Sequence, residues 1–391
     1  MVIQIDGVGT VNKGAELMLF AILQEIERKH PDATVFFNDA SFLGDSQNKD
    51  YFKGISVKIT KPYYTKPFFV GFLKRFHVYG IAERISPCVD ITHFLQRFCG
   101  TRANVLLSAE GFKYSDQFDL TSRKALQLRN YLRKFKKRGA KIVFMPQAFG
   151  PLQKQETVDF INAIRENADL IFAREKVSYD YMKDAGVASP PLYYYPDFTS
   201  LVDGVVPEKY KELKDYVCLI PNMQMVNNGI TTRDKYVKFW KHLIDFLQAN
   251  NHKVFLLNHE GKGDEQLVRE ISKMTGILYV DKLNAVETKG VISQSALVVS
   301  SRFHGVANAL SSCVPCLATS WSHKYQLLLE EYGQQDCVLD VNEPILAERK
   351  IVEKLENEIN SQIRAQLSES LAEINQRCRE MWSKIWKLYE K

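Results

Sequence analysis

The stretch LVVSSRFHGVANALSSCVPCLATS, at residues 297–320, decides the fold of this chain. Its first three residues, at 297–299, form a short apolar run rich in β-branched side chains, which is typical of a buried strand. Small and apolar residues at 306–312 predict a packed helix, and residues 317–319 begin the next strand. The order strand, loop, helix, strand is the unit from which doubly wound parallel sheets are built.

Arg302, His304 and Gly305 stand in the loop of this stretch, after its first strand. In open α/β sheets, ligands bind at the carboxyl ends of the strands. Arginine offers a planar fork of donors to a phosphate or carboxylate, and histidine exchanges protons near neutral pH. Gly305 leaves the start of the helix, which carries a partial positive charge, open to a ligand. These residues are therefore candidates for a binding or catalytic site. The alternative interpretation is a surface arginine and a histidine that caps the helix.

The N-terminus predicts the same order of elements. Residues 2–5 predict a strand, and apolar residues at helical spacing from 15 to 29 predict a helix. Between them, Gly7, Gly9 and Gly14 do not keep the spacing of the dinucleotide-binding fingerprint, so we expect no nicotinamide site. A glycine-rich turn before a helix is either a site for an anion or sugar or a plain tight turn.

Strands alternate with helices along the remaining chain. Further strands are predicted at residues 105–108, 141–144, 170–173, 193–195, 216–220, 254–257 and 277–280. Two successive sets of alternating elements predict an α/β fold with two Rossmann-like domains facing a cleft, at 1–205 and 206–345. A charged helical segment at 346–391 is expected to pack back across both domains. This architecture resembles that of the GT-B glycosyltransferases.

Length and composition fit two folded domains. A chain of 391 residues exceeds what one hydrophobic core normally serves. The hydrophobic share of 45% and the charged share of 25% are ordinary for a folded protein. The net charge of +6 is too small to predict a nucleic-acid partner.

Cysteine usage and the N-terminus indicate a cytoplasmic protein. Seven scattered cysteines, an odd number, favour reduced thiols. The start, MVIQIDGVG, lacks the basic and long apolar regions of a signal peptide, and no stretch approaches the ~20 apolar residues of a membrane span. Cys313 and Cys316 form a single CxxC pair, which we interpret as small core residues rather than a zinc site. We expect no metal site.

Short polar segments follow several of the predicted strands. They are Asn12-Lys13-Gly14, Pro146-Gln147-Ala148-Phe149-Gly150-Pro151, Arg174 with Ser178, Pro196-Asp197 and Arg302-Phe303-His304-Gly305. Together they resemble the polysaccharide pyruvyltransferase family, which has Asn-x-Gly, Pro-Gln-x-x-Gly-Pro, Arg-x-x-x-Ser, Pro-Asp and Arg-x-His-Gly segments at these points. The resemblance extends from Gly7 to Gly333 and is most specific at 146–151 and 302–305. The family usually has a Gly-Gly pair where this chain has Glu110-Gly111.

The resemblance implies transfer of a pyruvyl group from phosphoenolpyruvate to two hydroxyls of one sugar in a cell-surface polysaccharide precursor. A ketal forms and phosphate leaves, with phosphoenolpyruvate as co-substrate and no cofactor. His304 is the expected general acid. The expected donor-binding residues are Arg302, Arg174, Phe303, Gly305 and His259. The expected acceptor-binding residues are Asn12, Gly14, Glu110, Gln147 and Asp197.

Two other functions are compatible with the sequence. One is a GT-B glycosyltransferase with a nucleotide-sugar donor, although no base or ribose contacts can be located. The other is a non-catalytic sugar-binding or membrane-adaptor protein, which would tolerate the loss of His304.

Two segments of the first half predict contact with the inner face of the plasma membrane and a lipid-linked acceptor. Residues 66–76 mix large apolar and basic side chains, and the expected helix at 122–138 carries eight basic residues. The competing interpretation is that the first segment packs on the core and the second is a solvated helix face.

Overall fold

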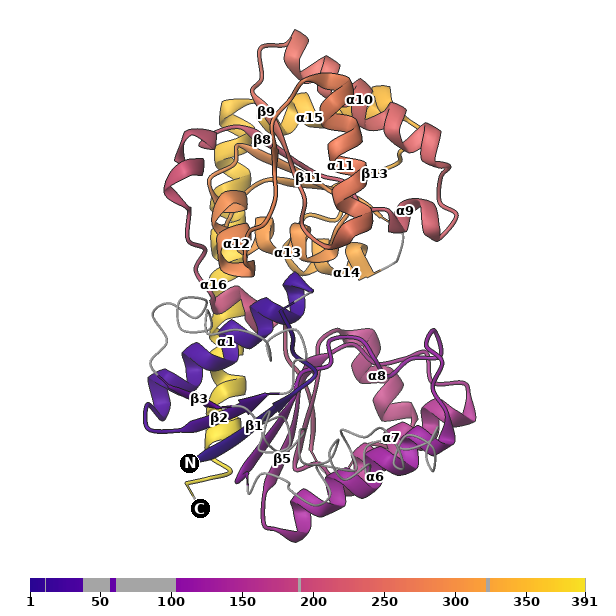
Figure 1. The fold of residues 1–391 in the computed structure, drawn as a ribbon, viewed down its shortest axis with the longest axis vertical. Coiled ribbons are helices and arrows are strands. Elements are labelled where there is room, and N and C mark those ends of the chain that lie inside the picture. The colour runs from indigo at the N-terminus through magenta and orange to yellow at the C-terminus, as the bar shows by residue number, and fades with distance from the viewer. Residues whose placement is uncertain (11, 38–56, 61–102, 189–190, 321–323, 391) are drawn as a thin grey trace, which may run out of the picture. The chain divides into compact units, whose positions relative to one another are not determined.

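The computed structural model describes residues 1–10, 12–37, 57–60, 103–188, 191–320 and 324–390 (Figure 1). The strands are β1 Val2–Asp6, β2 Thr34–Phe37, β3 Lys58–Thr60, β4 Val105–Ser108, β5 Lys141–Gln147, β6 Leu170–Ala173, β7 Leu192–Tyr194, β8 Val217–Ile220, β9 Val254–Leu257, β10 Tyr279–Val280, β11 Leu297–Ser300, β12 Cys316–Thr319 and β13 Val338–Leu339. The α-helices are α1 Lys13–Lys29, α6 Ser122–Lys137, α7 Gln155–Asn167, α8 Lys176–Asp184, α9 Gln224–Asn227, α10 Arg233–Ala249, α11 Gly261–Thr275, α12 Ala285–Ser293, α13 Phe303–Leu310, α14 Lys324–Glu331, α15 Pro344–Leu355 and α16 Asn357–Trp386. Short 3₁₀ helices span Phe198–Leu201 (η3) and Glu208–Leu213 (η4).

The strands form two parallel sheets. The seven-stranded sheet has the order β3-β2-β1-β4-β5-β6-β7, and the six-stranded sheet has the order β10-β9-β8-β11-β12-β13. Neighbouring strands pair in parallel in both. Counted from its own first strand, the six-stranded sheet runs 3-2-1-4-5-6, which is the order of the Rossmann fold, and the seven-stranded sheet has the same order with a seventh strand added at its end. The expected α/β fold with Rossmann-like halves is confirmed. Strands β2, β3 and β13 were not expected, because runs of four, three and two residues are too short to show a periodic pattern.

The chain divides into two compact units. Unit 1 comprises Met1–Thr10, Met18–Phe198 and Cys378–Lys391, and unit 2 comprises Val11–Leu17 and Thr199–Arg377. The first turn of α1 thus belongs to unit 2, although the sequence division assigned it to the first domain. Similarly, α15 and most of α16 belong to unit 2, and only the last residues of α16 belong to unit 1. A helical pattern shows which face is apolar but not which unit buries each turn.

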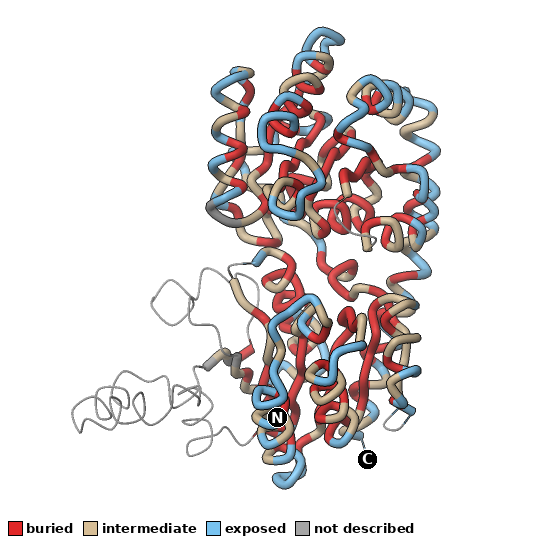
Figure 2. Tube along the Cα trace, turned by 90° about the vertical axis from the view of Figure 1, so that its right-hand side faces the viewer, coloured by how far each residue is buried: buried red, intermediate tan, exposed pale blue. Residues whose placement is uncertain are grey.

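Burial explains why the strands lack the alternation of a half-exposed sheet. The central strands β4, β8, β9, β11 and β12 are buried along their whole length (Figure 2). Parallel sheets covered on both faces are expected to have such continuous apolar strands. Around the second sheet, α10 packs against α11 and α15, and α12 packs against α13. Polar groups must therefore concentrate at the strand ends.

Local sequence signals fix the ends of several helices. Asn284 accepts a hydrogen bond from the Glu287 backbone N–H at 2.8 Å, and the Glu287 carboxylate accepts one from the Asn284 N–H at 3.0 Å, which is a capping box at the start of α12. Helix α11 ends at Gly276, whose φ of 72° suits glycine.

Within the described part of the chain, no helix has both the length and the apolar character needed to cross a membrane.

Candidate functional site

The candidate site of unit 2 lies at the topological switch point of its sheet, where the order of the strands reverses. Strands β8 and β11 are neighbours at that point, and ligands of open α/β sheets bind outside the carboxyl ends of such strands. Asn222 follows β8, and its Nδ2 donates to the carbonyl oxygen of Ser301, after β11, at 3.0 Å. This hydrogen bond joins the two loops that border the switch point.

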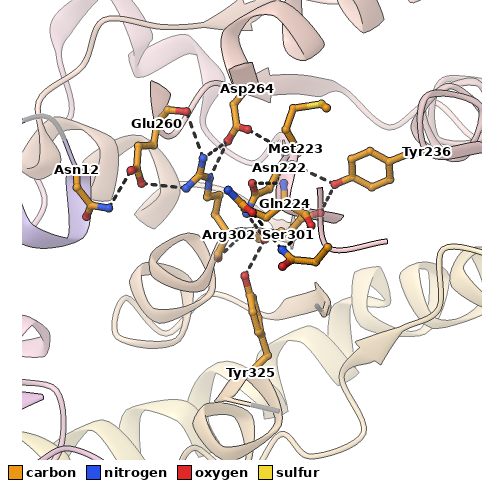
Figure 3. Close-up of polar contacts among 12 residues, drawn as sticks. Asn12, Asn222, Met223, Gln224, Tyr236, Glu260, Asp264, Ser301, Arg302 and Tyr325 are labelled. Atoms are coloured by element: carbon orange, nitrogen blue, oxygen red, sulfur yellow. Dashed lines mark hydrogen bonds and ion pairs between the residues drawn. The ribbon is translucent and has the colours of Figure 1, made fainter. Parts of the chain in front are cut away.

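Buried hydroxyl groups hold Ser301 in place (Figure 3). Its Oγ lies 2.5 Å from the Tyr236 hydroxyl and also bonds the hydroxyl of Thr319. Tyr325 donates to its carbonyl oxygen at 2.8 Å. A buried polar network whose members are all bonded is rigid. The backbone that presents the next residue, Arg302, is therefore fixed.

The Arg302 guanidinium is held by two carboxylates from the loop and helix that follow β9 (Figure 3). Its Nε donates to Asp264 Oδ2 at 2.7 Å, and its Nη2 lies 2.6 Å from the same oxygen. Its Nη1 donates to Glu260 Oε2 at 3.0 Å. The side chains of Arg302 and Glu260 are each 19% exposed, whereas that of Asp264 is 2% exposed. Arg302 is thus partly accessible, and one of its two partners is deeply buried.

Each carboxylate has a second partner. Asp264 Oδ1 accepts the Met223 backbone N–H at 2.9 Å, and Glu260 Oε1 accepts from Asn12 Nδ2 at 2.8 Å. Burial raises the pKa of both carboxyl groups, and the Arg302 guanidinium lowers both without overcoming burial. The contact with Asn12 brings the N-terminal loop to the same strand ends as Arg302.

His304 lies on the first turn of α13 and against the first turn of α1. A Cβ atom built on Gly14 would lie 2.1–2.4 Å from three atoms of the His304 imidazole. Real side chains do not approach so closely, so only glycine leaves room for this ring. The Phe303 ring packs edge-on against His304 at a centroid distance of 5.3 Å, and Lys324 Nζ lies 5.2 Å from the Phe303 centroid. At Gly305, a Cβ atom would lie 2.4 Å from Ser300 Oγ.

His259, which follows β9, is 1% exposed. Neither of its ring nitrogens has a hydrogen-bond partner among the described residues. Burial, and after it the nearby Arg302, His304 and Lys13, hold its pKa well below the ordinary value. His259 is therefore neutral near pH 7. A buried polar group without a partner indicates a place for a ligand or a water molecule.

Sequence reasoning missed Lys13 and Glu16, on the first turn of α1. Lys13 Nζ lies 2.6 Å from Glu16 Oε2, and the Glu16 side chain is fully buried. Burial raises the Glu16 pKa to about 7 although Lys13 and the Ala285 backbone N–H both lower it. The ion pair was detectable as an i, i+3 charge pair, but its burial depends on contacts with α12 far along the chain.

The predicted residues of unit 1 gather at the ends of its consecutive strands β5, β6 and β7. Arg174, after β6, donates from Nε to Glu175 Oε1 at 3.1 Å and from Nη1 to Asp197 Oδ2 at 3.4 Å. Ser178 donates to Glu175 Oε2 at 2.7 Å and accepts the Phe149 N–H at 2.9 Å. The Arg-x-x-x-Ser segment is thus joined to the Pro-Gln-x-x-Gly-Pro loop.

Gln147 ends strand β5 and is fully buried. Among the described residues, neither its amide nitrogen nor its amide oxygen has a hydrogen-bond partner. It is the unit 1 counterpart of His259, because both are buried polar groups at strand ends.

Glu110 follows β4 and pairs with Lys113 at 2.8 Å. The missed residue nearby is Asp6, at the end of β1, which accepts from Tyr131 at 2.7 Å and from Gln4 at 3.0 Å. Burial raises the Asp6 pKa, Glu110 adds to that effect, and the two hydrogen bonds oppose it.

The structure groups the predicted site residues differently from the sequence. Asn12 and Gly14, expected with the acceptor, lie in unit 2 with the donor candidates His259, Arg302 and His304. Arg174, expected with the donor, lies in unit 1 and pairs with Asp197. Glu110 and Gln147 are also in unit 1.

Solved structures with a similar fold support the GT-B-like architecture. The UDP-GlcNAc 2-epimerase from Methanocaldococcus jannaschii is 10% identical, with a TM-score of 0.55 over 91% of this chain and 93% of that chain. Alr3699/HepE from Anabaena, solved in complex with UDP-glucose, is 13% identical, with a TM-score of 0.58 over 98% of this chain and 100% of that chain. The UDP-GlcNAc 2-epimerase from Neisseria meningitidis is 10% identical, with a TM-score of 0.58 over 99% of this chain and 100% of that chain. Likeness at this level of identity concerns the fold alone.

The sequence of the chain shows which family it belongs to. The polysaccharide pyruvyl transferase family matches residues 12–323, which are most of the chain. The protein therefore belongs to this family of enzymes, and the resemblance seen in its strand-end segments is confirmed.

Proposed function

We propose that this protein transfers a pyruvyl group from phosphoenolpyruvate to two hydroxyl groups of one sugar in a cell-surface polysaccharide precursor, forming a pyruvate ketal. The observation that carries the proposal is the pair Arg302 and His304, which stands at a topological switch point within the matched family segment. Most of the proposed donor-binding residues belong to unit 2, and most of the proposed acceptor-binding residues belong to unit 1.

The donor is a small anion with a phosphate and a carboxylate, so its site needs cations. Arg302 offers a guanidinium that is 19% exposed, and Lys13 is close enough to lower the pKa of His259. The neutral His259 supplies a hydrogen bond to the donor, and Phe303 and Gly305 shape the start of α13. Arg174 is the proposed second arginine for the donor.

His304 acts as the general acid in the proposed reaction. It gives a proton to the methylene carbon of phosphoenolpyruvate, and the adjacent carbon gains positive character. One sugar hydroxyl attacks that carbon, phosphate leaves, and the second hydroxyl closes the ketal. Two hydroxyl protons are lost and one proton is taken up by the new methyl group, so one proton leaves with the phosphate.

The acceptor is proposed to bind to polar groups at the strand ends. Gln147 offers both a donor and an acceptor that no described residue uses, and Glu110 and Asp197 accept from sugar hydroxyls. Asn12 and Gly14, which belong to unit 2, are the other proposed acceptor-binding residues.

Phosphate release from phosphoenolpyruvate tests the function. The purified protein is incubated with phosphoenolpyruvate and a panel of free and lipid-linked sugars, and the His304→Ala variant is measured in parallel. We expect turnover that depends on the sugar and falls by ~10² or more in His304→Ala while donor binding persists. His252→Ala, a change in the same unit outside the site, is the matched control. Consumption of nucleotide sugars in place of phosphoenolpyruvate would establish glycosyl transfer, and sugar binding without consumption of either would establish a non-catalytic protein.

A lipid-linked acceptor and peripheral membrane contact belong to the same proposal, at the cytoplasmic face of the membrane. Helix α6 was predicted to carry the basic contact surface. Part of its charge is used within unit 1, because Arg129 and Arg133 both pair with Glu166 of α7, at 3.1 and 2.9 Å. Arg123 and Lys137 are both exposed and lie on the same face of the helix, because a spacing of 14 residues is nearly four whole turns, so they support the proposal. The apolar segment at 66–76 lies outside the described residues.

Co-sedimentation with anionic vesicles tests membrane contact. We expect binding at low salt that weakens as salt rises, and a loss of about 1 kcal/mol for each charge removed. The test variant changes Arg123 and Lys137 to Glu, and the control changes the exposed Lys209 and Lys214 of unit 2 to Glu. Wild-type protein that remains in the supernatant at low salt, or equal losses in the two variants, would contradict contact through α6.

A further inference from the structure

The two carboxylates on Arg302 are not equivalent. Asp264 is 2% exposed, contacts both Nε and Nη2 of the guanidinium, and also accepts the Met223 backbone N–H. Glu260 is 19% exposed and contacts Nη1 through one oxygen. Asp264 therefore orients the guanidinium, whereas Glu260 covers its remaining edge.

The charges at this point are unfavourable for an anionic donor. Arg302 carries one positive charge, and Glu260 and Asp264 together carry two negative charges when both are ionised. A guanidinium has five N–H groups, and an anion binds best to two that lie side by side. The edge formed by Nη1 and Nη2 faces Glu260, whose carboxylate accepts from Nη1 at 3.0 Å and whose backbone carbonyl oxygen accepts from Nη2 at the longer distance of 3.4 Å. A two-point contact between this edge and an anion therefore needs the Glu260 carboxylate to leave Nη1.

We infer that Glu260 occupies the edge of Arg302 that the donor's anionic group takes, so that donor binding displaces the Glu260 carboxylate while Asp264 keeps the guanidinium in place. This inference rests on the proposed function, because it assumes that Arg302 binds the anionic donor. The Glu260 side chain has the features of a group that moves. It precedes α11 without capping that helix, it is partly exposed, and Asn12 holds its other oxygen at 2.8 Å. Burial raises the pKa of Glu260, and the neighbouring Asp264 adds to this effect, whereas Arg302 and Asn12 oppose it.

A competing carboxylate makes an unusual prediction, namely that removing it improves binding. In Glu260→Gln the side chain can still accept from Asn12, but it no longer presents a negative charge to Nη1. We expect phosphoenolpyruvate to bind up to about fivefold more tightly, which corresponds to the strength of a partly exposed ion pair. A residue that merely supported Arg302 would give weaker binding when changed.

Isothermal titration of the full chain with phosphoenolpyruvate, and separately with inorganic phosphate, tests this inference. The matched control is Glu265→Gln, which removes the same charge from the same helix, where Glu265 pairs with Arg269 at 2.6 Å. Support is tighter binding by Glu260→Gln with no change in Glu265→Gln, together with a lower KM for phosphoenolpyruvate. Equal or weaker binding by Glu260→Gln overturns the inference.

Two further variants separate the possible failures. Asn12→Ser keeps an oxygen that can accept the Ala15 N–H, as Asn12 Oδ1 does at 3.0 Å, but loses the amide that holds Glu260. It should also tighten binding, by a smaller factor, and it reports on Glu260 if Glu260→Gln fails to fold. If Arg302→Gln bound phosphoenolpyruvate as tightly as the wild type does, the donor would bind elsewhere. The inference would then fail together with the proposed donor site. Binding that is lost in Arg302→Gln but not tightened in Glu260→Gln would overturn the inference alone.

Discussion

Arg174 of unit 1 and Arg302 of unit 2 differ although both follow a parallel strand and both contact two carboxylates. The partners of Arg174 are its neighbour Glu175 and Asp197, and Ser178 ties Glu175 to the preceding loop. The partners of Arg302 come from another loop and helix, and the N-terminal segment holds one of them. Arg174 is 7% exposed and Arg302 is 19% exposed. Arg174 is thus more a part of the framework, and Arg302 is better placed to exchange a partner for a ligand.

The largest effect is expected from Gly14→Ala, which tests whether α1 shapes the unit 2 site. The new Cβ would fall 2.1–2.4 Å from the His304 ring, so the imidazole must move. A misplacement of about 1 Å lowers catalysis by ~10². We expect a fall in kcat of that size, measured as phosphate release at saturating donor.

Gly263→Ala is the control for this substitution. It places a Cβ 3.8 Å from Met223 Cγ, an ordinary contact, on an exposed position of α11. It should leave kcat unchanged and stabilise the helix slightly. If Gly14→Ala retained wild-type kcat, His304 could not be the acid in the position described.

Changing each arginine to lysine sharpens the comparison between units. Lysine cannot make a bidentate contact, so both changes should weaken phosphoenolpyruvate binding, by about tenfold if one charge-assisted hydrogen bond is lost. Arg174→Lys should also lower the free energy of unfolding by about 2 kcal/mol, because it disturbs a more deeply buried ion pair. Arg302→Lys should cost less stability. Titration calorimetry and thermal unfolding measure the two effects, and unchanged affinity in either variant would remove that arginine from the donor site.

The sequence predicted the residues of the strand ends better than it predicted their partners. Arg302 and His304 were found because they follow a clear strand and precede a helix. The acids on Arg302 lie 38 and 42 residues away in the chain, so no local pattern could pair them with it. Arg174 and Ser178 were found as a segment, but the carboxylate that joins them, Glu175, was not assigned a role.

The first turn of α1 was the main surprise. Helical spacing predicted the helix, but the division of α1 between two units depends on tertiary contacts of individual turns. Asn12 and Gly14 were predicted with the acceptor without any indication that they lie beside Glu260 and His304, and Lys13 and Glu16 were assigned no role. Both outcomes have one cause, since periodicity reports the apolar face of a helix and not the identity of its neighbours.

An effect that depends on pH concerns two buried carboxyl groups, Glu16 in unit 2 and Asp6 in unit 1. Burial raises the pKa of Glu16 to about 7 and also raises that of Asp6. A carboxyl whose pKa is higher in the folded than in the unfolded state binds a proton on folding. Its contribution therefore lowers stability as pH rises through the interval between the two pKa values, which is about 4.5 to 7 for Glu16.

Glu16→Gln should remove this contribution, because the amide does not ionise. A pKa difference of this size corresponds to about 3 kcal/mol at most, and a unit of this length shifts in Tm by roughly 2–4 °C per kcal/mol. Relative to Glu16→Gln, the wild type should lose several degrees of Tm between pH 5 and pH 7.5. Thermal unfolding at both pH values measures the difference, with Glu265→Gln as a control that alters only a partly exposed pair. Asp6→Asn should act on the unfolding of unit 1 in the same direction. Parallel Tm profiles for wild type and Glu16→Gln would show that the Lys13 ion pair, rather than burial, determines the charge of Glu16.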